Sequence, residues 1–108
     1  ALAGGLLRSV HAPDALLDTA REIAREIAEN TAAVSVSLTR QMLWRGLGMS
    51  HPMEAHRIDS RAVYARGRSA DAGEGVTSFL EKRAQIYPDK VSQDMPGFYP
   101  WWEEPAWR

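Results

Sequence analysis

Apolar residues recur every three or four positions along several stretches of this sequence, which places them on one face of a helix. The clearest stretch covers about residues 14–29, where charged side chains fill the opposite face. Its apolar stripe comprises Leu16, Leu17, Ala20, Ile23, Ala24, Ile27 and Ala28. A helix that is apolar along one side needs a packing partner on that side. The pattern therefore predicts an all-α domain.

Two further helices are predicted from cap residues and glycines. Thr31 is a suitable N-cap for a helix over about 32–45. Ser50 is a suitable N-cap for a helix over about 52–66, whose first residue is a proline. Weak helix formers are frequent in the first of these two, so we expect it to depend on tertiary packing.

A last helix is predicted from Ser69, a suitable N-cap, to about Arg83. Gly73 and Gly75 weaken its first half, so we expect a kink there or a division into two pieces. The sequence thus predicts three to four helices in total.

Residues 85–108 differ in character from the rest of the chain. They are rich in proline, and each proline biases the preceding residue toward an extended conformation. They are also rich in tyrosine and tryptophan, whereas disordered tails are poor in aromatic residues. We expect an extended Pro/Trp-rich tail that lies along a protein surface, with a mobile terminus as the alternative.

Composition excludes several classes of function. The 108 residues include no cysteine, which removes disulfides, thiolate catalysis and cysteine zinc sites. A formal net charge of -1 argues against a nucleic-acid partner. No apolar run approaches the roughly 20 residues that span a bilayer. With no signal-peptide pattern and no cysteine, we expect a cytoplasmic protein without nucleic-acid or membrane partners.

Catalytic and metal-binding residues are not expected. His11, His51 and His56 lack the spacing of a zinc site, so we interpret them as solvated or capping residues. Most carboxylates alternate with arginines on helix faces, and none is marked as the desolvated member of an acid–base pair.

Three segments together carry a resemblance to a known family. Residues 69–83, SADAGEGVTSFLEKR, resemble the signature that closes the fold of the enoyl-CoA hydratase/isomerase (crotonase) family. Residues 4–30 look like the family's preceding helical segment, and Thr31 to Gly46 look like its next helix. The order and spacing match over residues 4 to about 88, and the tail looks like the extension of some members.

The resemblance implies a division of the chain into three parts. Residues 1–13 would be the end of a missing crotonase core and a linker, residues 14–84 the C-terminal helical domain, and residues 85–108 the tail. The missing core would supply the oxyanion hole and the acidic catalytic residues. We therefore expect the chain alone to lack hydratase activity, and to bind no cofactor, although the parent would act on coenzyme A thioesters.

The resemblance also implies two roles for the helices. They would assemble subunits, as a trimer or hexamer in the parent and a dimer or trimer for this chain. They would also complete the acyl-CoA site of a neighbouring subunit through Phe79 and Lys82, near the adenine and the phosphates. Each residue has a plainer interpretation, Phe79 as a core residue and Lys82 as a solvated cation at a helix end.

Two other functions are compatible with the residues. A free-standing helical module could present its apolar face to a partner protein. A small helical nucleic-acid binder is disfavoured by the charge.

Overall fold

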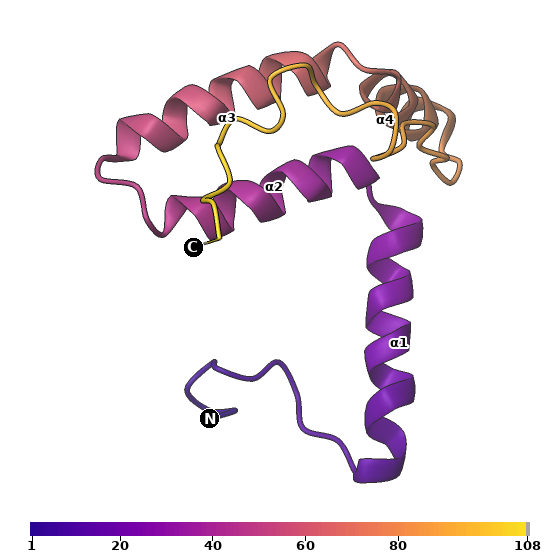
Figure 1. The fold of residues 1–108 in the computed structure, drawn as a ribbon. Coiled ribbons are helices and arrows are strands. Elements are labelled where there is room, and N and C mark those ends of the chain that lie inside the picture. The colour runs from indigo at the N-terminus through magenta and orange to yellow at the C-terminus, as the bar shows by residue number, and fades with distance from the viewer. Residues whose placement is uncertain (108) are drawn as a thin grey trace. The chain divides into compact units, whose positions relative to one another are not determined.

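The structure is a computed structural model that describes residues 1–107. It contains four helices and, within those residues, no strand (Figure 1), so the all-α prediction is confirmed. The helices are α1 (Pro13–Asn30), α2 (Ala33–Gly46), α3 (Pro52–Gly67) and α4 (Ala70–Glu81). The chain after α4 is non-helical as far as residue 107, as expected for an extended tail.

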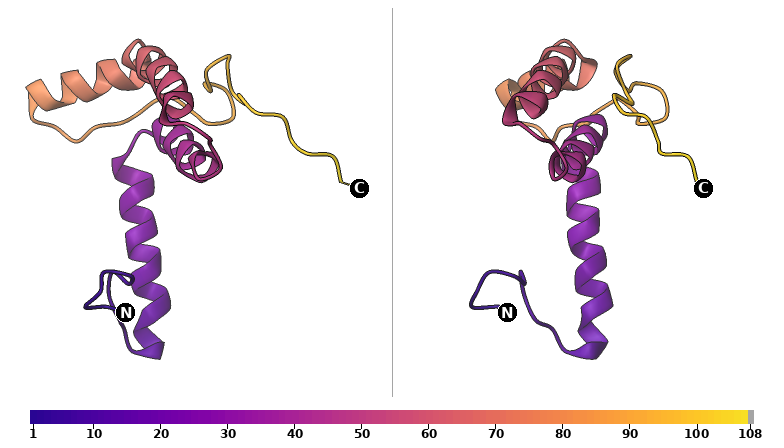
Figure 2. Two further views of the ribbon diagram at one scale, coloured as in Figure 1. Left: turned by 90° about the vertical axis from the view of Figure 1, so that its left-hand side faces the viewer. Right: turned by 60° about the vertical axis from the view of Figure 1, so that its left-hand side comes forward.

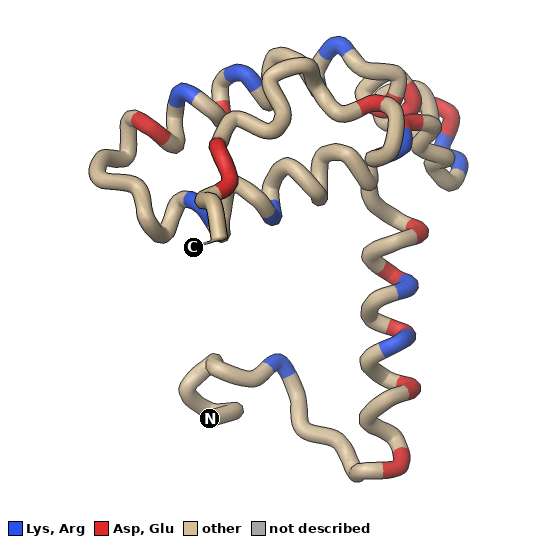
Figure 3. Tube along the Cα trace, viewed as in Figure 1, with Lys and Arg blue, Asp and Glu red and all other residues tan. Residues whose placement is uncertain are grey.

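The chain divides into two units, residues 1–30 and the residues from Thr31 onward. In the first unit, α1 carries residues of both charge signs along its length (Figure 3). None of its residues is buried, and Leu16 and Leu17 are 55% and 58% exposed. Residues 1–12 therefore leave the apolar stripe of α1 uncovered.

In the second unit, α2 and α3 lie side by side and run in opposite directions (Figure 1), and α3 also contacts α4 (Figure 2). The buried core consists of Val34 and Leu38 from α2 and Ala62 from α3. Val34 and Leu38 are one helical turn apart, so both side chains lie on the same face of α2. Although α2 is only weakly amphipathic, it thus packs into the core through a short apolar stripe of two residues.

The tail completes that core. Met95, Phe98, Tyr99 and Trp101 are partly buried and pack against the buried residues of α2 and α3. Neighbouring aromatic rings meet edge to face, with 4.9 Å between the ring centroids of Trp101 and Trp102. The tail therefore lies as a strap over the α2–α3 pair.

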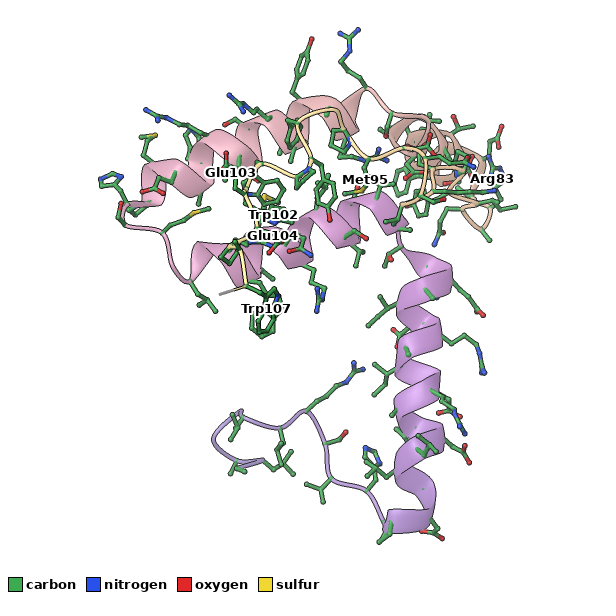
Figure 4. The ribbon with its side chains drawn as sticks, viewed as in Figure 1. Arg83, Met95, Trp102, Glu103, Glu104 and Trp107 are labelled. Atoms are coloured by element: carbon green, nitrogen blue, oxygen red, sulfur yellow. The ribbon has the colours of Figure 1, made fainter. Side chains whose placement is uncertain are left out.

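The far end of the strap is fixed to α2 by a charged residue. The Arg45 guanidinium lies 3.5 Å from the centre of the Trp102 ring and donates to Glu104 Oε1 at 2.8 Å. Figure 4 shows Trp102 and Glu104 next to each other beside α2. The Trp102 indole N–H, followed by Arg45, lowers the pKa of the Glu104 carboxyl. The cation–π contact with Trp102 and the ion pair with Glu104 thus both join Arg45 to the tail.

Three local predictions were wrong. The N-cap of α2 is Ala32, which has no side-chain acceptor, and not Thr31. The N-cap of α3 is His51, whose Nδ1 accepts from the Met53 N–H at 3.0 Å, while Ser50 donates to Glu54. The expected division of the last helix into two pieces is absent, because α4 is one continuous helix that includes Gly73 and Gly75.

Candidate functional site at the end of helix α4

The start of α4 is fixed by polar contacts. Ser69 Oγ accepts the Ala72 N–H at 3.3 Å and also donates to the Arg66 carbonyl at 2.7 Å. Asp71, in the first turn, is 2% exposed. A carboxylate here is favoured by the positive end of the helix dipole. The hydrogen bonds of Ser69 therefore fix the first turn of α4 to the end of α3.

The end of α4 is a left-handed turn at Lys82. In residues 1–107, Lys82 is the only non-glycine residue with positive φ, at φ 53° and ψ 40°. The N–H groups of Lys82 and Arg83 donate to the carbonyls of Phe79 and Ser78. This arrangement satisfies carbonyls that the helix leaves unpaired, and glycine is the usual residue at such a position. A side chain other than hydrogen at this position is therefore unfavourable for the backbone.

Phe79 and Lys82 both lie at this end of α4. They line one hollow, together with Gly75, Ser78, Arg83, Gln85 and Tyr87. Phe79 is 82% exposed, so it is not part of the core of this chain. Val76 and Leu80 beside it are 62% and 73% exposed. The helix thus presents an apolar stripe to its surroundings, with an ammonium group at its end.

Glu74 and Arg83 form a charged pair next to the hollow. The Glu74 carboxylate accepts from Arg83 Nη1 and Nη2 at 2.6 and 2.8 Å, and from the Ile86 N–H at 2.7 Å. Hydrogen bonds from Arg83 and then from Ile86 lower the pKa of Glu74 to about 2. The hydrogen bonds that Arg83 donates to Glu74 and then to Glu81 raise the pKa of Arg83. The carboxylate therefore stays ionised at neutral pH.

Arg66 is the centre of a second, more buried network. Its Nη2 donates to Asp71 Oδ2 and to Asp89 Oδ2, both at 2.7 Å, and its Nε donates to Ser35 Oγ at 3.3 Å. The Asp89 N–H also donates to Asp71 Oδ1 at 3.0 Å. One guanidinium thus connects α2, α3, α4 and the tail. Burial of both carboxylates is compensated by this shared cation.

Sequence reasoning did not identify the residues that build these networks. Glu74 and Arg83 are nine residues apart on either side of a reversal, beyond the spacing at which two helical side chains meet. Arg66 and Asp89 are further apart still. The sequence gives one indication of these networks. Asp71 and Glu74 are acidic residues about one turn apart, so they lie on the same side of α4.

The described residues hold no group of three histidine or carboxylate side chains placed to bind a metal ion. His51 serves as a helix cap, in agreement with its predicted role. Across residues 1–107, no helix combines the length and the apolarity needed to cross a membrane.

Known proteins similar to this chain are enoyl-CoA hydratases. "Enoyl-CoA hydratase AFT3-1" of Alternaria alternata is 40% identical over 92 residues, which is 85% of this chain and 30% of that protein. "Enoyl-CoA hydratase ACTT3" of the same organism is 39% identical over the same length. "Short-chain-enoyl-CoA hydratase" of Clostridium acetobutylicum is 36% identical over 83 residues, 77% of this chain and 31% of that protein. This chain is homologous to the enoyl-CoA hydratases.

The predicted relationship is therefore confirmed, and it extends over most of the chain. The chain spans about 30% of the length of these hydratases. No protein-family model matches it. The match joins proteins of a fungus and a bacterium, so the shared segment is not peculiar to one of them.

Proposed function

We propose that this chain is the C-terminal helical domain of an enoyl-CoA hydratase/isomerase family protein. In that protein it assembles subunits and completes the acyl-CoA site of a neighbouring subunit. The whole protein acts on acyl-CoA thioesters and stabilises the thioester enolate. Homology over 85% of the chain to a protein of which the match covers only 30% is the observation that carries this proposal.

The proposed contacts with coenzyme A are made by Phe79 and Lys82. An exposed phenyl ring is available to stack against the adenine, and an ammonium group pairs with phosphate as a point charge. Both residues line the hollow at the end of α4, which favours contact with one ligand. Exposure of Phe79 in this chain fits a residue whose partner lies on another subunit.

The proposed role in assembly rests on exposed apolar side chains. Leu43 and Trp44 at the end of α2 and the cap residue Leu47 are 69%, 64% and 84% exposed, and they follow one another within about one turn. The stripe on α4 adds Val76 and Leu80. Such surface favours association, with the missing core and with further copies of the chain. We expect a trimer or hexamer for the whole protein, in the cytoplasm, and dimers or trimers for this chain.

We expect the chain by itself to be inactive. Hydration needs an oxyanion hole and carboxylates poised as acid and base. In the part of the chain that the structure describes, the least exposed carboxylates, Asp71, Asp89 and Glu74, accept hydrogen bonds from arginines or backbone amides. Detectable turnover of crotonyl-CoA by the purified chain would contradict this expectation.

The first test is the reading frame that encodes the chain. A continuation upstream into a crotonase core supports the proposal. A start codon directly before the codon for Ala1 favours a free-standing interaction module and removes the enzymatic role.

The second test uses the complete encoded protein. Phe79→Ala and Lys82→Ala should each raise the KM for a CoA thioester by about tenfold, because stacking and charge-assisted contacts are worth roughly 1–3 kcal/mol each. The KM for a pantetheine thioester of the same acyl group should not change, since that substrate lacks the nucleotide.

Two matched variants control for general damage. Val91→Ala removes an exposed apolar side chain from the tail, and Lys90→Ala removes the other lysine of the chain. Neither should alter the KM for the CoA thioester. Equal effects of Lys82→Ala and Lys90→Ala would remove Lys82 from the site.

A further inference from the structure

The chain reverses direction after α4 and runs back along the helix. The Ile86 N–H donates to Glu74 at 2.7 Å, and the Asp89 N–H donates to Asp71 at 3.0 Å. The two acceptors are three residues apart on α4, and the two donors are three residues apart on the returning segment. Between these bonds the Tyr87 ring lies against Gly75, where an added Cβ would be 3.7 Å from the phenol oxygen. The returning segment thus has a defined register on α4.

Glu74 differs from Asp71 because it also holds the turn itself. Its two oxygens receive the two terminal nitrogens of Arg83, the residue directly after Lys82. Arg83 Nη1 donates to the Ala84 carbonyl at 3.1 Å as well. The Glu74 side chain is only 16% exposed, so these bonds are partly shielded from water. One carboxylate therefore fixes the chain on the far side of the left-handed residue.

The left-handed conformation of Lys82 needs this external support. A residue with a Cβ is disfavoured at positive φ, so an unrestrained turn would populate other conformations. In those conformations the Lys82 side chain would point elsewhere, and the last turn of α4, which carries Phe79, would lose its terminal hydrogen bonds.

We propose that Glu74 is a positioning residue for coenzyme A, which holds Phe79 and Lys82 in the geometry that meets the nucleotide. It acts through Arg83 and the Ile86 amide and touches no substrate atom itself. This inference rests on the proposed function, since it assigns the nucleotide contacts to Phe79 and Lys82. A site preorganised in this way loses less entropy when the ligand binds.

A matched control is present two turns along the same helix. Glu81 Oε2 accepts from Arg83 Nε at 2.7 Å, so it shares the arginine with Glu74. Its side chain is 57% exposed, and its hydrogen bond with Arg83 does not involve the returning backbone. Glu81→Gln therefore removes one charge beside Arg83 and leaves the hold on Ile86 in place.

The first experiment uses the chain itself. Glu74→Gln should speed hydrogen exchange of the Ile86 amide by about tenfold, and Glu81→Gln should leave the rate within twofold of the unmodified chain. Circular dichroism should give the same helix content for all three proteins. Unchanged exchange at Ile86 in Glu74→Gln would overturn the inference, because the turn would be held without the carboxylate.

The second experiment uses the complete protein and two substrates. Glu74→Gln should raise the KM for a CoA thioester about fivefold with kcat within twofold, and should leave the KM for the matching pantetheine thioester unchanged. A purely structural role would instead lower kcat or raise both KM values. Either of these two results would overturn the inference.

Failure of the inference and failure of the proposed function give different results. If Phe79→Ala and Lys82→Ala raise the KM for the CoA thioester and Glu74→Gln does not, only the positioning role is overturned. If all three variants keep the original KM, the coenzyme A assignment itself is wrong and the positioning role falls with it.

Discussion

Helices α1 and α2 show opposite relations between sequence pattern and burial. The α1 sequence has the clearest apolar stripe of the chain, yet none of its residues is buried. The α2 sequence is only weakly amphipathic, yet Val34 and Leu38 are 0% and 1% exposed. Periodicity identifies the face of a helix that requires cover. It does not identify the segment that supplies the cover, and for α2 that segment includes the tail.

The largest expected effect comes from removing the cover of α2. A chain that ends at Ala84 loses Met95, Phe98, Tyr99 and Trp101 from the core, and leaves Arg66 without Asp89. We expect the second unit to lose its cooperative thermal unfolding, monitored by circular dichroism. A chain that ends at Trp101 keeps these contacts and should keep the transition. A cooperative transition in the shorter chain would show that the tail is dispensable.

The next largest effect separates a buried ion pair from an exposed one. Arg66→Met leaves two nearly buried carboxylates facing each other, which should lower the free energy of unfolding by about 3–5 kcal/mol. Arg21→Met in α1 removes an exposed pair with Asp18 and should cost less than about 1 kcal/mol. Urea denaturation measures both. Similar losses for the two variants would contradict the difference between the units.

A third pair of variants tests the apolar contacts directly. Leu38→Ala opens a cavity in the core and should lower the free energy of unfolding by about 2–4 kcal/mol. Leu17→Ala removes a side chain that is 58% exposed and should cost less than about 1 kcal/mol. A large loss for Leu17→Ala in urea denaturation would mean that the α1 stripe is covered in solution.

The turn at Lys82 predicts a gain in stability. Lys82→Gly relieves the left-handed strain and should raise the free energy of unfolding by about 1 kcal/mol. Lys82→Ala keeps the Cβ and should bring no such gain. Thermal unfolding of both variants distinguishes backbone strain from loss of the ammonium group.

The smallest expected effect is the pH dependence of the stability that the Glu74–Arg83 pair contributes, because water screens a partly exposed ion pair. The pKa of Glu74 is about 2 in the folded chain and 4.5 ordinarily. A lowered folded pKa means that stabilisation is complete above pH 4.5 and is lost as the pH falls toward 2. Glu74→Gln should flatten the fall of the melting temperature across that window. An unchanged slope would mean that the Arg83 pair does not contribute.

The helices were predictable from the sequence because their signals are local. Spacing of apolar residues and glycine positions give four helices within one to two residues of those observed. The caps were less predictable, since Ser50 and His51 are adjacent in the sequence and both side chains can accept a hydrogen bond, whereas in the structure the Met53 N–H donates to His51. The unbroken α4 was missed because glycine propensity is a local property, whereas the contacts of α4 with α3 and with the returning segment favour one continuous helix.

The candidate site was predictable only in part, and for a different reason. Phe79 and Lys82 were singled out through resemblance to a family, whose motif specifies residue types at fixed spacing. The groups that hold them, above all Glu74 and Arg83, meet only after the chain has reversed. No local pattern encodes such a pair, because its members are brought together by the left-handed residue between them.

Closure of the α2 core by the tail has a consequence for the rate of folding. The helical pair α2–α3 can form early, since its contacts join residues close in sequence. The start of α2 and the tail residues that pack against the core, in contrast, come from opposite ends of the second unit, so packing of the tail closes a long loop before its apolar residues are buried. This domain should therefore fold more slowly than a helical bundle of equal length with short connections. While the tail is not yet packed, Leu38, which is 1% exposed in the folded chain, should be accessible to solvent.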